Sequence, residues 1–530
     1  MFFIQSMNLQ SLYRLPLALD EILLRYKNAT AIICVFLFAI IGFVTIQEHP
    51  MWLDEVQAWL IAYTSQSFSE VYEKLGQEGH PYLWHLILYG LTRVSEDPED
   101  MQILHWAIGV GAMIFFWWRC PFAIHQKVLF TFGFFPIYEY LIKSRNYLPS
   151  MFLLFVVCAL LPNRHRNYIP LAVALGFLAT VHAFSIFISC TIALILGVEY
   201  IRAVWLEKSD LISASKFNVS ISIVIFLGLL GSALFPIYIS ATTALTTPLE
   251  TEETVYNFEV VLKIAGEFLH GIVFISPHSG RLIDQVAGSV ALLGIVAATA
   301  YYARNSRVAI QYCLIATSVL TIFAIATNLP IRIRHAGFLF LILISTIWIS
   351  QTAGSSASRL KHLADNYSRK FSVVFSLILI VHMVAGCLFI KQTHNWRFSA
   401  GKDTVKFLRD HKLQDRILIG YMVLGMPAIS AYLSKPIYYP ELGRMGTYAP
   451  WVEIEEITAT EVLWETKKIV CGQHPLFSKQ ALETSGPPIL IFVYTNPLPK
   501  SDRYTLRYST KKSMREDYLV YETVPEKWDC

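Results

Sequence analysis

The stretch Trp52–Leu83, WLDEVQAWLIAYTSQSFSEVYEKLGQEGHPYL, interrupts a chain that otherwise consists largely of apolar segments. Asp54 and Glu55 come directly after a first hydrophobic span, and His80 comes just before the chain returns to apolar sequence. Ionisable side chains beside hydrocarbon are costly unless water, a partner or a substrate receives them. The stretch therefore predicts an outer loop that gathers carboxylates and an imidazole at one membrane surface.

The first part of this loop is typical of a short helix from Asp54 to about Tyr63. We expect Asp54 to be its N-cap, with Gln57 as the second member of a capping-box-like pair. An acidic cap explains the carboxylates without any chemistry. The apolar residues at helical spacing predict a helix that lies on the membrane surface. They are Val56, Trp59, Leu60 and Tyr63.

The composition is that of a polytopic membrane protein. Of the 530 residues, 55% are hydrophobic and 15% are charged, whereas soluble domains carry about 25% charged residues. The net charge of +4 is too small to indicate nucleic-acid binding. Membrane lipids are therefore expected partners, and nucleic acid is not.

The apolar segments predict about eleven membrane spans. Arg14, Arg25 and Lys27 precede the first span and place the N-terminus inside by the positive-inside rule. Residues 82–94 are interpreted as interfacial, because a crossing there would put the basic residues 164–166 outside. The expected spans are residues 29–46, 103–118, 128–142, 148–161, 169–181, 184–201, 219–239, 286–302, 310–327, 336–349 and 371–390.

Two units follow from this topology. Residues 1–391 form a transmembrane module with outer loops at 47–102 and 240–285, and residues 392–530 form an extracytoplasmic α/β domain with short strands at 416–419 and 489–494. The expected fold class is therefore mainly α, with a C-terminal α/β domain. Cys471 and Cys530 lie in this domain, where a disulfide is open to them if the domain is outside.

The order of an apolar span, W-x-D-E-x-x-A-W, a polar stretch and GHPYLWHLIL resembles the first outer loop of the polytopic GT-C glycosyltransferases. This group includes protein O-mannosyltransferases and bacterial aminoarabinose transferases. The resemblance implies transfer of a sugar, with inversion, from a polyprenyl-phosphate donor. It implies Asp54 as the catalytic base, with Glu55 as a second candidate that also fits a structural role. The His80–Pro81 step is kept, while the residues after it depart from the family pattern.

Two basic clusters at outer helix ends resemble segments of the same family. The first cluster is Lys143–Tyr147. Its cations either snorkel to the interface or have a function. In the functional case, Arg145 anchors the loop through Asp54 or Glu55, or it contacts the donor phosphate. Residues 332–335 either clamp that phosphate or contact a lipid headgroup. His80 is interpreted as an acceptor-pocket residue, a metal ligand or an interface residue. The candidate substrate-binding residues are His80, Arg145, Tyr147, His182, Arg332, Arg334 and His335.

The resemblance implies a bacterial inner-membrane enzyme whose active site is extracytoplasmic. Its partners would be the donor and an acceptor that is a glycan, a lipid or a protein. The sequence leaves open whether a divalent ion is used and which residues would bind it. The alternative is a transporter or flippase of lipid-linked sugars, although the ionisable groups gather at one surface and no repeat is evident.

Overall fold

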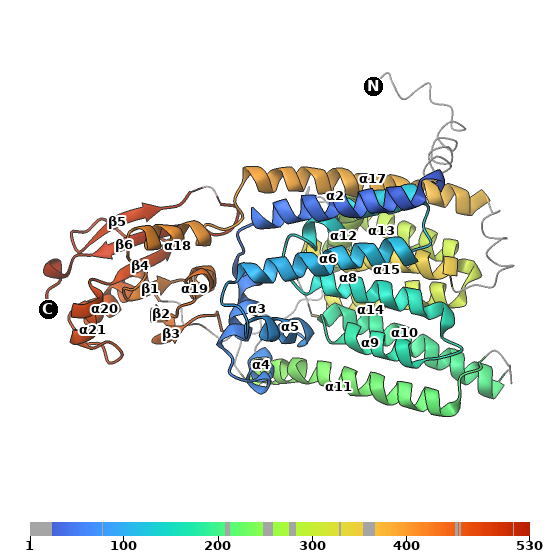
Figure 1. Cartoon of the computed structure of the whole chain (residues 1–530), viewed down its shortest axis with the longest axis horizontal. Helices are drawn as coiled ribbons and strands as arrows, with labels where there is room; N and C mark the ends of the chain where they lie inside the picture. The colour runs from blue at the N-terminus through green and yellow to red at the C-terminus, as the bar shows by residue number, and fades with distance from the viewer. Residues whose placement is uncertain are drawn as a thin grey trace, which may run out of the picture.

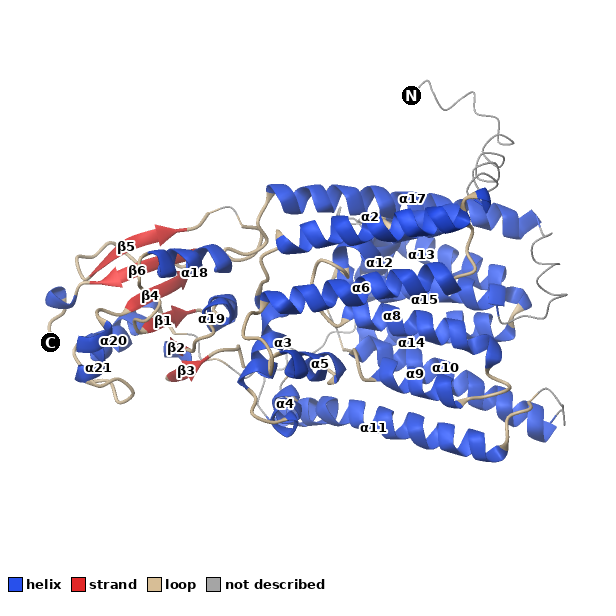
Figure 2. Cartoon of the chain, viewed as in Figure 1, coloured by secondary structure: helices blue, strands red, loops and turns tan. Residues whose placement is uncertain are grey.

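The computed structural model describes residues 24–76, 78–206, 212–246, 258–274, 282–327, 330–352, 366–450, 454, 457–511 and 513–530. A bundle of long helices forms one part, and a smaller C-terminal part lies at one end of this bundle (Figure 1). The smaller part holds all the described strands (Figure 2).

Eight helices in the described part of the chain are long and apolar enough to cross a membrane, by length and composition. About 20 helical residues cover the hydrocarbon core. Large apolar side chains such as Phe36, Trp118 and Leu227 are exposed on these helices, as expected where lipid replaces water. The expected mainly helical class is confirmed, and the eight helices are compatible with a polytopic membrane protein. The eight helices are α2 (Lys27–Gln47), α6 (Glu99–Arg119), α10 (Ala183–Ile201), α11 (Lys216–Thr246), α13 (Leu282–Tyr302), α14 (Arg307–Ala326), α15 (Ile333–Thr352) and α17 (Asn366–Asn395).

One segment that we expected to cross, residues 128–142, is broken. It divides between α7 (Ile124–Thr131) and the π-helix η1 (Phe134–Glu139). Gly133 lies between them in an extended conformation, and Pro136 has no N–H for a helical hydrogen bond. The expected span is therefore not one continuous α-helix.

Two other expected spans are shorter than a full crossing requires. Residues 148–161 and 169–181 correspond to α8 (Tyr147–Leu160) and α9 (Ile169–Ala179). The first helix passes into the 3-10 helix η2 (Leu161–Asn163), because Pro162 has no N–H to continue the α-helical hydrogen bonds. Both helices are largely buried within the bundle, and they extend its core without meeting the length of a full span.

Helix α3 (Leu53–Thr64) follows the first span directly. Its N-cap is Trp52, which makes no side-chain capping bond, so the expected Asp54 cap is wrong. Asp54 instead lies in the first turn. Gln57 takes no part in a capping box, because its amide donates to the Ala449 carbonyl at 2.6 Å and accepts from the Ala449 N–H at 3.0 Å.

The apolar face of α3 packs against protein. Val56, Trp59 and Leu60 are buried in one hydrophobic cluster with the C-terminal part, including α19 (Pro427–Leu433). We expected this face to lie on the membrane surface. That expectation is wrong, because protein covers the face. Burial of a large apolar side chain contributes roughly 1.5–3 kcal/mol, so this cluster stabilises the contact between α3 and the C-terminal part.

Three further helices surround this end of the bundle. Helix α5 has nine residues, too few to cross. In the expected outer loop 240–285, α11 continues to Thr246, and α12 covers most of the other residues that the structure describes there. Residues 247–257 and 275–281 lie outside the described residues. The three helices are α4 (Phe68–Leu75), α5 (Leu83–Leu91) and α12 (Phe258–Val273).

The C-terminal part contains a six-stranded sheet with the order β3-β2-β1-β4-β6-β5. The central strands β2, β1 and β4 are parallel, and the outer pairs are antiparallel. The expected strands at 416–419 and 489–494 correspond to β1 and β4. The strands are β1 (Leu418–Tyr421), β2 (Ile437–Tyr439), β3 (Arg444–Gly446), β4 (Ile489–Val493), β5 (Tyr504–Ser509) and β6 (Tyr518–Thr523).

Both faces of the sheet are covered, as the continuous apolar run of β4 requires. Leu408 of α18 packs with Ile489 on the face toward the bundle, while Val462 of α20 packs with Leu490 on the other. A disulfide joins Cys471 to Cys530, whose Cα atoms are 5.4 Å apart. The remaining helices are α18 (Gly401–Asp410), α20 (Ala459–Val470) and α21 (Lys479–Ser485).

Candidate functional site

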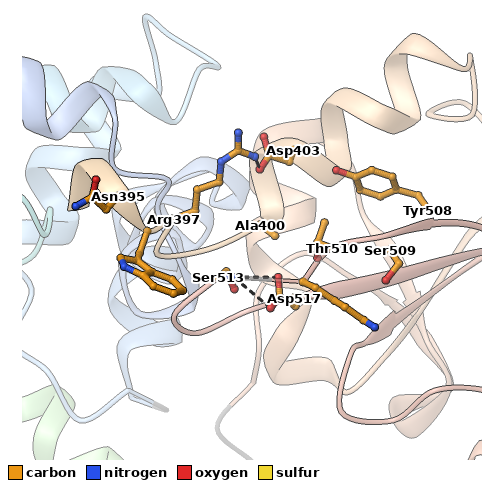
Figure 3. A pocket seen from close by; sticks show the side chains of 11 residues that line it. Asn395, Arg397, Ala400, Asp403, Tyr508, Ser509, Thr510, Ser513 and Asp517 are labelled. Carbon is orange, nitrogen blue, oxygen red and sulfur yellow. Dashed lines mark hydrogen bonds and ion pairs between the residues drawn. The ribbon is translucent and has the colours of Figure 1, made fainter. Parts of the chain in front are cut away.

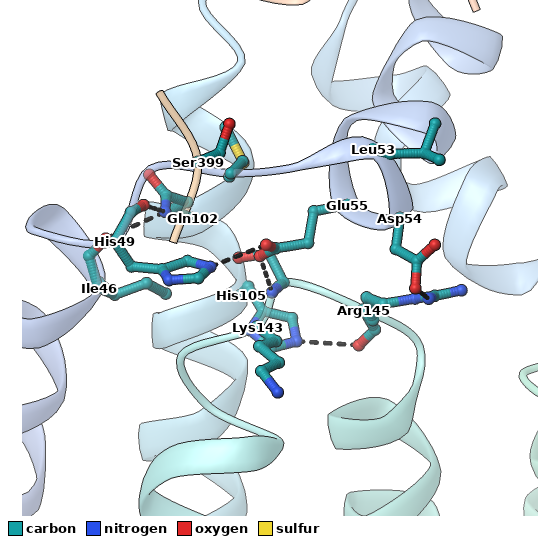
Figure 4. Close-up of polar contacts among 12 residues, drawn as sticks. Ile46, His49, Leu53, Asp54, Glu55, Gln102, His105, Lys143, Arg145 and Ser399 are labelled. Carbon is teal, nitrogen blue, oxygen red and sulfur yellow. Dashed lines mark hydrogen bonds and ion pairs between the residues drawn. The ribbon is translucent and has the colours of Figure 1, made fainter. Parts of the chain in front are cut away.

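Asp54 is held by two arginines that come from distant parts of the sequence. Its Oδ2 atom lies 2.6 Å from Nη1 of Arg145 and 2.8 Å from Nη2 of Arg334. Arg145 precedes α8, and Arg334 lies in the first turn of α15. Figure 4 shows the Asp54 carboxylate directed toward Arg145. The structure thus joins the first loop to both of the basic clusters that the sequence singled out.

The surroundings of Asp54 keep its carboxylate ionised. Burial raises the pKa of Asp54, but the guanidiniums of Arg145 and Arg334 more than offset this, so its pKa lies below the ordinary value. Its side chain is 14% exposed. Both arginines contact Oδ2 of Asp54.

Glu55 points the opposite way and is fully buried. One carboxylate oxygen accepts from the Ser144 N–H at 2.7 Å, and the other lies 2.8 Å from Nε2 of His49 (Figure 4). Both oxygens therefore have partners within the protein. This geometry supports the structural alternative for Glu55, because it ties α3 to the segment that carries Arg145.

His105 of α6 holds the backbone of the segment that carries Arg145. Its ring nitrogens lie 3.1 Å from the Leu141 carbonyl and 2.9 Å from the Arg145 carbonyl. Gln102, one turn earlier on α6, donates to the carbonyls of Ile46 and His49 at 3.0 and 2.8 Å. The sequence analysis missed these supports, although polar residues within an apolar span are the signal that would have found them.

Imidazole and phenol rings form a second group beside Asp54. The ring of His182 lies 5.5 Å from that of His80 and 4.7 Å from that of Tyr147, between centroids. His335 lies 6.2 Å from Tyr147. His182 is the N-cap of α10, and its Nδ1 accepts from the Phe184 N–H at 3.0 Å. The structure therefore brings four predicted site residues together.

His80 and His182 are neutral at neutral pH. Burial and the nearby Arg145 lower the pKa of His80 to about 4. Burial, together with His80 and other neighbours, lowers the pKa of His182 well below its ordinary value. A neutral imidazole offers one donor and one acceptor, so these rings can orient a hydroxyl or a phosphate oxygen.

Several buried polar atoms around Asp54 have no hydrogen-bond partner among the described residues. Most buried polar groups in proteins are bonded, so a local gathering of exceptions calls for an explanation. Trp52 belongs to this group, and the Arg334 guanidinium lies over its ring at 5.9 Å from the centroid. The atoms are Trp52 Nε1, His80 Nδ1, His182 Nε2 and Arg334 Nε.

Other predicted residues have different surroundings. Lys143 contacts Glu139 at 2.5 Å and lies over the Phe398 ring, not at Asp54. Arg332 is exposed, and its backbone N–H donates to Nδ1 of His335 at 3.3 Å. Of these two arginines, Arg334 is the one that contacts Asp54, and the expected phosphate clamp stays a prediction. Tyr147 is buried.

Close packing sets the position of Arg334. The Tyr140 hydroxyl donates to the Arg334 carbonyl at 3.0 Å. A Cβ atom at Gly337 would collide with that hydroxyl and would lie 2.5 Å from Cε1 of Phe135. Gly337 therefore allows α15 to approach η1 closely enough for Arg334 to reach Asp54.

The described residues contain no group of three or more His, Cys, Asp or Glu side chains arranged to hold a metal ion. No protein-family model and no curated protein matches the chain. The chemistry of the site consequently follows from its own side chains: one ionised carboxylate, two guanidiniums and neutral imidazoles at one end of a helical bundle.

Proposed function

We propose that the protein is a membrane glycosyltransferase of the GT-C type. It would move a sugar from a polyprenyl-phosphate donor to a hydroxyl-bearing acceptor on the extracytoplasmic side. The observation that carries this proposal is the set of unpartnered buried donors around an ionised carboxylate that is paired with two arginines. A phosphorylated sugar supplies the acceptor atoms that these groups lack.

Asp54 is the base in this proposal. The acceptor oxygen attacks the anomeric carbon, and the bond from that carbon to the phosphate oxygen breaks. The electron pair leaves with the polyprenyl phosphate, and the acceptor proton passes to the Asp54 carboxylate. A single displacement inverts the anomeric centre. Because the pKa of Asp54 is low, proton transfer is expected late, when the attacking hydroxyl has become acidic.

Arg145 and Arg334 would act on both carboxylate and phosphate. Glycosyl transfer builds negative charge on the leaving phosphate, and preorganised cationic donors stabilise such charge strongly. A guanidinium has five N–H donors, so each arginine retains donors after its contact with Asp54. His80 and His182 would complete the site by hydrogen bonds to sugar hydroxyls.

The extracytoplasmic orientation rests on two features. Arg119, Arg164 and Arg304 lie at or just after the C-terminal ends of α6, α8 and α13, at the end of the bundle far from the C-terminal part (Figure 1), which fits an inner surface there. The Cys471–Cys530 disulfide fits an oxidising compartment for the C-terminal part. A bacterial inner membrane is the proposed location.

The transporter alternative is supported less well. Transporters place their binding groups near the bilayer midplane on interrupted helices. Asp54 of α3 instead meets Arg145 and Arg334, and α3 lies at the end of the bundle on which the C-terminal part docks (Figure 1). That position suits a reaction with an acceptor that arrives from outside the membrane.

The test uses purified protein and a panel of radiolabelled polyprenyl-phosphate sugars, with release or transfer of the sugar as the readout. Turnover of one donor supports the proposal and identifies the sugar. If no donor binds or turns over, the proposal fails, and flux of lipid-linked sugar in liposomes then tests the transporter. Activity that a chelator removes and one added ion restores would establish a divalent cofactor.

A further inference from the structure

A cavity of about 600 Å³ lies away from Asp54, between the end of α17 and the edge of the sheet. One wall is formed by residues between 395 and 403. The other is formed by the end of β5 and by described residues after it, namely Tyr508, Ser509, Thr510, Lys511, Ser513 and Asp517. Its volume falls within the range of about 300–1,000 Å³ that small-molecule sites occupy. Figure 3 shows Arg397 and Asp403 on one wall and Tyr508, Ser513 and Asp517 on the other.

The lining offers donors and acceptors in balance. Arg397 and Lys511 are cations, and Asp403 and Asp517 are carboxylates, so the formal charges of the lining cancel. Arg397 pairs with Asp403. Serine and threonine side chains, which both donate and accept, line the rest of the β5 wall. A net-neutral wall of this kind disfavours a free anion and suits a neutral molecule with many hydroxyls.

Aromatic rings complete the lining. Trp396 is 53% exposed and lines the cavity at the end of the last membrane helix. Tyr508 is stacked on Phe407, with centroids 4.4 Å apart and planes 8° from parallel. Its ring orientation is therefore fixed by packing. A flat, partly exposed ring beside alternating donors and acceptors matches a sugar, which has apolar C–H faces and a polar rim.

The cavity is connected to the start of α3 by hydrogen bonds. Ser513 Oγ and the Ala400 N–H both donate to the Glu516 carbonyl, at 2.6 and 2.9 Å. The Glu516 carboxylate in turn accepts from the Leu53 N–H at 2.9 Å. A ligand that orders the cavity walls therefore orders the segment directly before Asp54.

We propose that this cavity is a second carbohydrate site, separate from the Asp54 site, which binds one or two sugar units of a glycan or a glycolipid headgroup. This proposal rests on the residues that line the cavity and does not depend on sugar transfer by the protein. Its place at the end of a membrane helix allows either source, free glycan or glycolipid, to reach it.

The experiment is saturation-transfer NMR on the full chain in phosphatidylcholine nanodiscs that contain no sugar-based detergent. Methyl glycosides of glucose, galactose, mannose and N-acetylglucosamine are tested in one arm, and nanodiscs doped with a monoglucosyl or monogalactosyl lipid in the other. Signals in the first arm indicate a free glycan site, and signals in the second arm alone indicate a glycolipid site.

Two variants locate the binding. Trp396→Ala removes the exposed ring, and Ser509→Trp fills the cavity from an exposed position on β5. Each is expected to weaken binding at least about tenfold, the loss typical of one well-placed contact. Trp464→Ala is the control for the first, since Trp464 is 59% exposed on α20 outside the lining. Thr505→Trp, on the same strand, is the control for the second.

Retention of the signals in the controls and their loss in both variants supports the site. The inference is overturned if no glycoside and no glycolipid gives a signal in the wild type. It is equally overturned if the signals persist in Trp396→Ala and Ser509→Trp, because the sugar then binds elsewhere.

Discussion

Glu516 is a buried carboxylate that joins the C-terminal part to the start of α3. It accepts from the Leu53 N–H at 2.9 Å, from Ser399 Oγ at 2.6 Å and from the Tyr518 hydroxyl at 3.2 Å. Burial raises the pKa of Glu516 to about 7, against these hydrogen bonds, which lower it. Glu516→Gln keeps the shape and an acceptor for Leu53, and removes the ionisation.

The sign and size of the effect follow from this pKa. A carboxyl group whose pKa is higher in the folded state binds its proton more tightly there, so ionisation costs stability as pH rises from about 4.5 to about 7. One pKa unit corresponds to about 1.4 kcal/mol, which makes the full cost about 3 kcal/mol above pH 7. Glu516→Gln should therefore stabilise the protein by up to about 3 kcal/mol at pH 8 and have little effect near pH 4.5.

The assay is thermal unfolding in detergent at a series of pH values. The difference in Tm between variant and wild type should be near zero at pH 4.5 and should become positive between pH 5 and pH 8. Glu526→Gln, at an exposed position, is the control and should show no pH-dependent difference. A variant that is less stable than the wild type at pH 8, or a difference independent of pH, would refute the reasoning.

Two further predictions concern Arg334 and its support. Arg334→Ala should weaken donor binding or turnover at least about tenfold through loss of a charged contact. Arg332→Ala, at the exposed neighbouring arginine, should leave both nearly unchanged. Equal effects of the two variants in a donor assay would contradict the assigned geometry. Gly337→Ala should destabilise by roughly 1–3 kcal/mol through overpacking against Tyr140 and should lower turnover, while Gly294→Ala, where nothing lies within 4 Å of the added carbon, should do neither in the same unfolding and turnover assays.

Hydropathy predicted the fold class, because a membrane selects long apolar segments whatever their tertiary contacts. It did not predict the break at Gly133 and Pro136. Hydropathy averages the apolar character of a segment and does not show where a helix loses its hydrogen bonds. Periodicity identified the apolar face of α3, but the same stripe fits lipid or protein. Only packing shows that Val56 and Trp59 face the C-terminal part.

The site residues that could be predicted were those with a signal in the local sequence. Asp54, Arg145 and Arg334 stand out as ionisable residues beside apolar spans, and the expected topology put all three at one surface. Their contacts to one another depend on distances across the bundle, which the sequence does not contain. Trp52 and Glu516 were missed because their roles arise from contacts with residues far along the chain.

The central claim is that Asp54 is the base of a sugar transfer. The direct measurement compares turnover and affinity for the best polyprenyl-phosphate sugar in the wild type, in Asp54→Asn and in Glu73→Gln, an exposed carboxylate on α4. Loss of a general base lowers turnover by about 10²–10⁴, so we expect that loss in Asp54→Asn with the protein folded, and wild-type turnover in Glu73→Gln. Turnover of Asp54→Asn within a few-fold of the wild type would contradict the account.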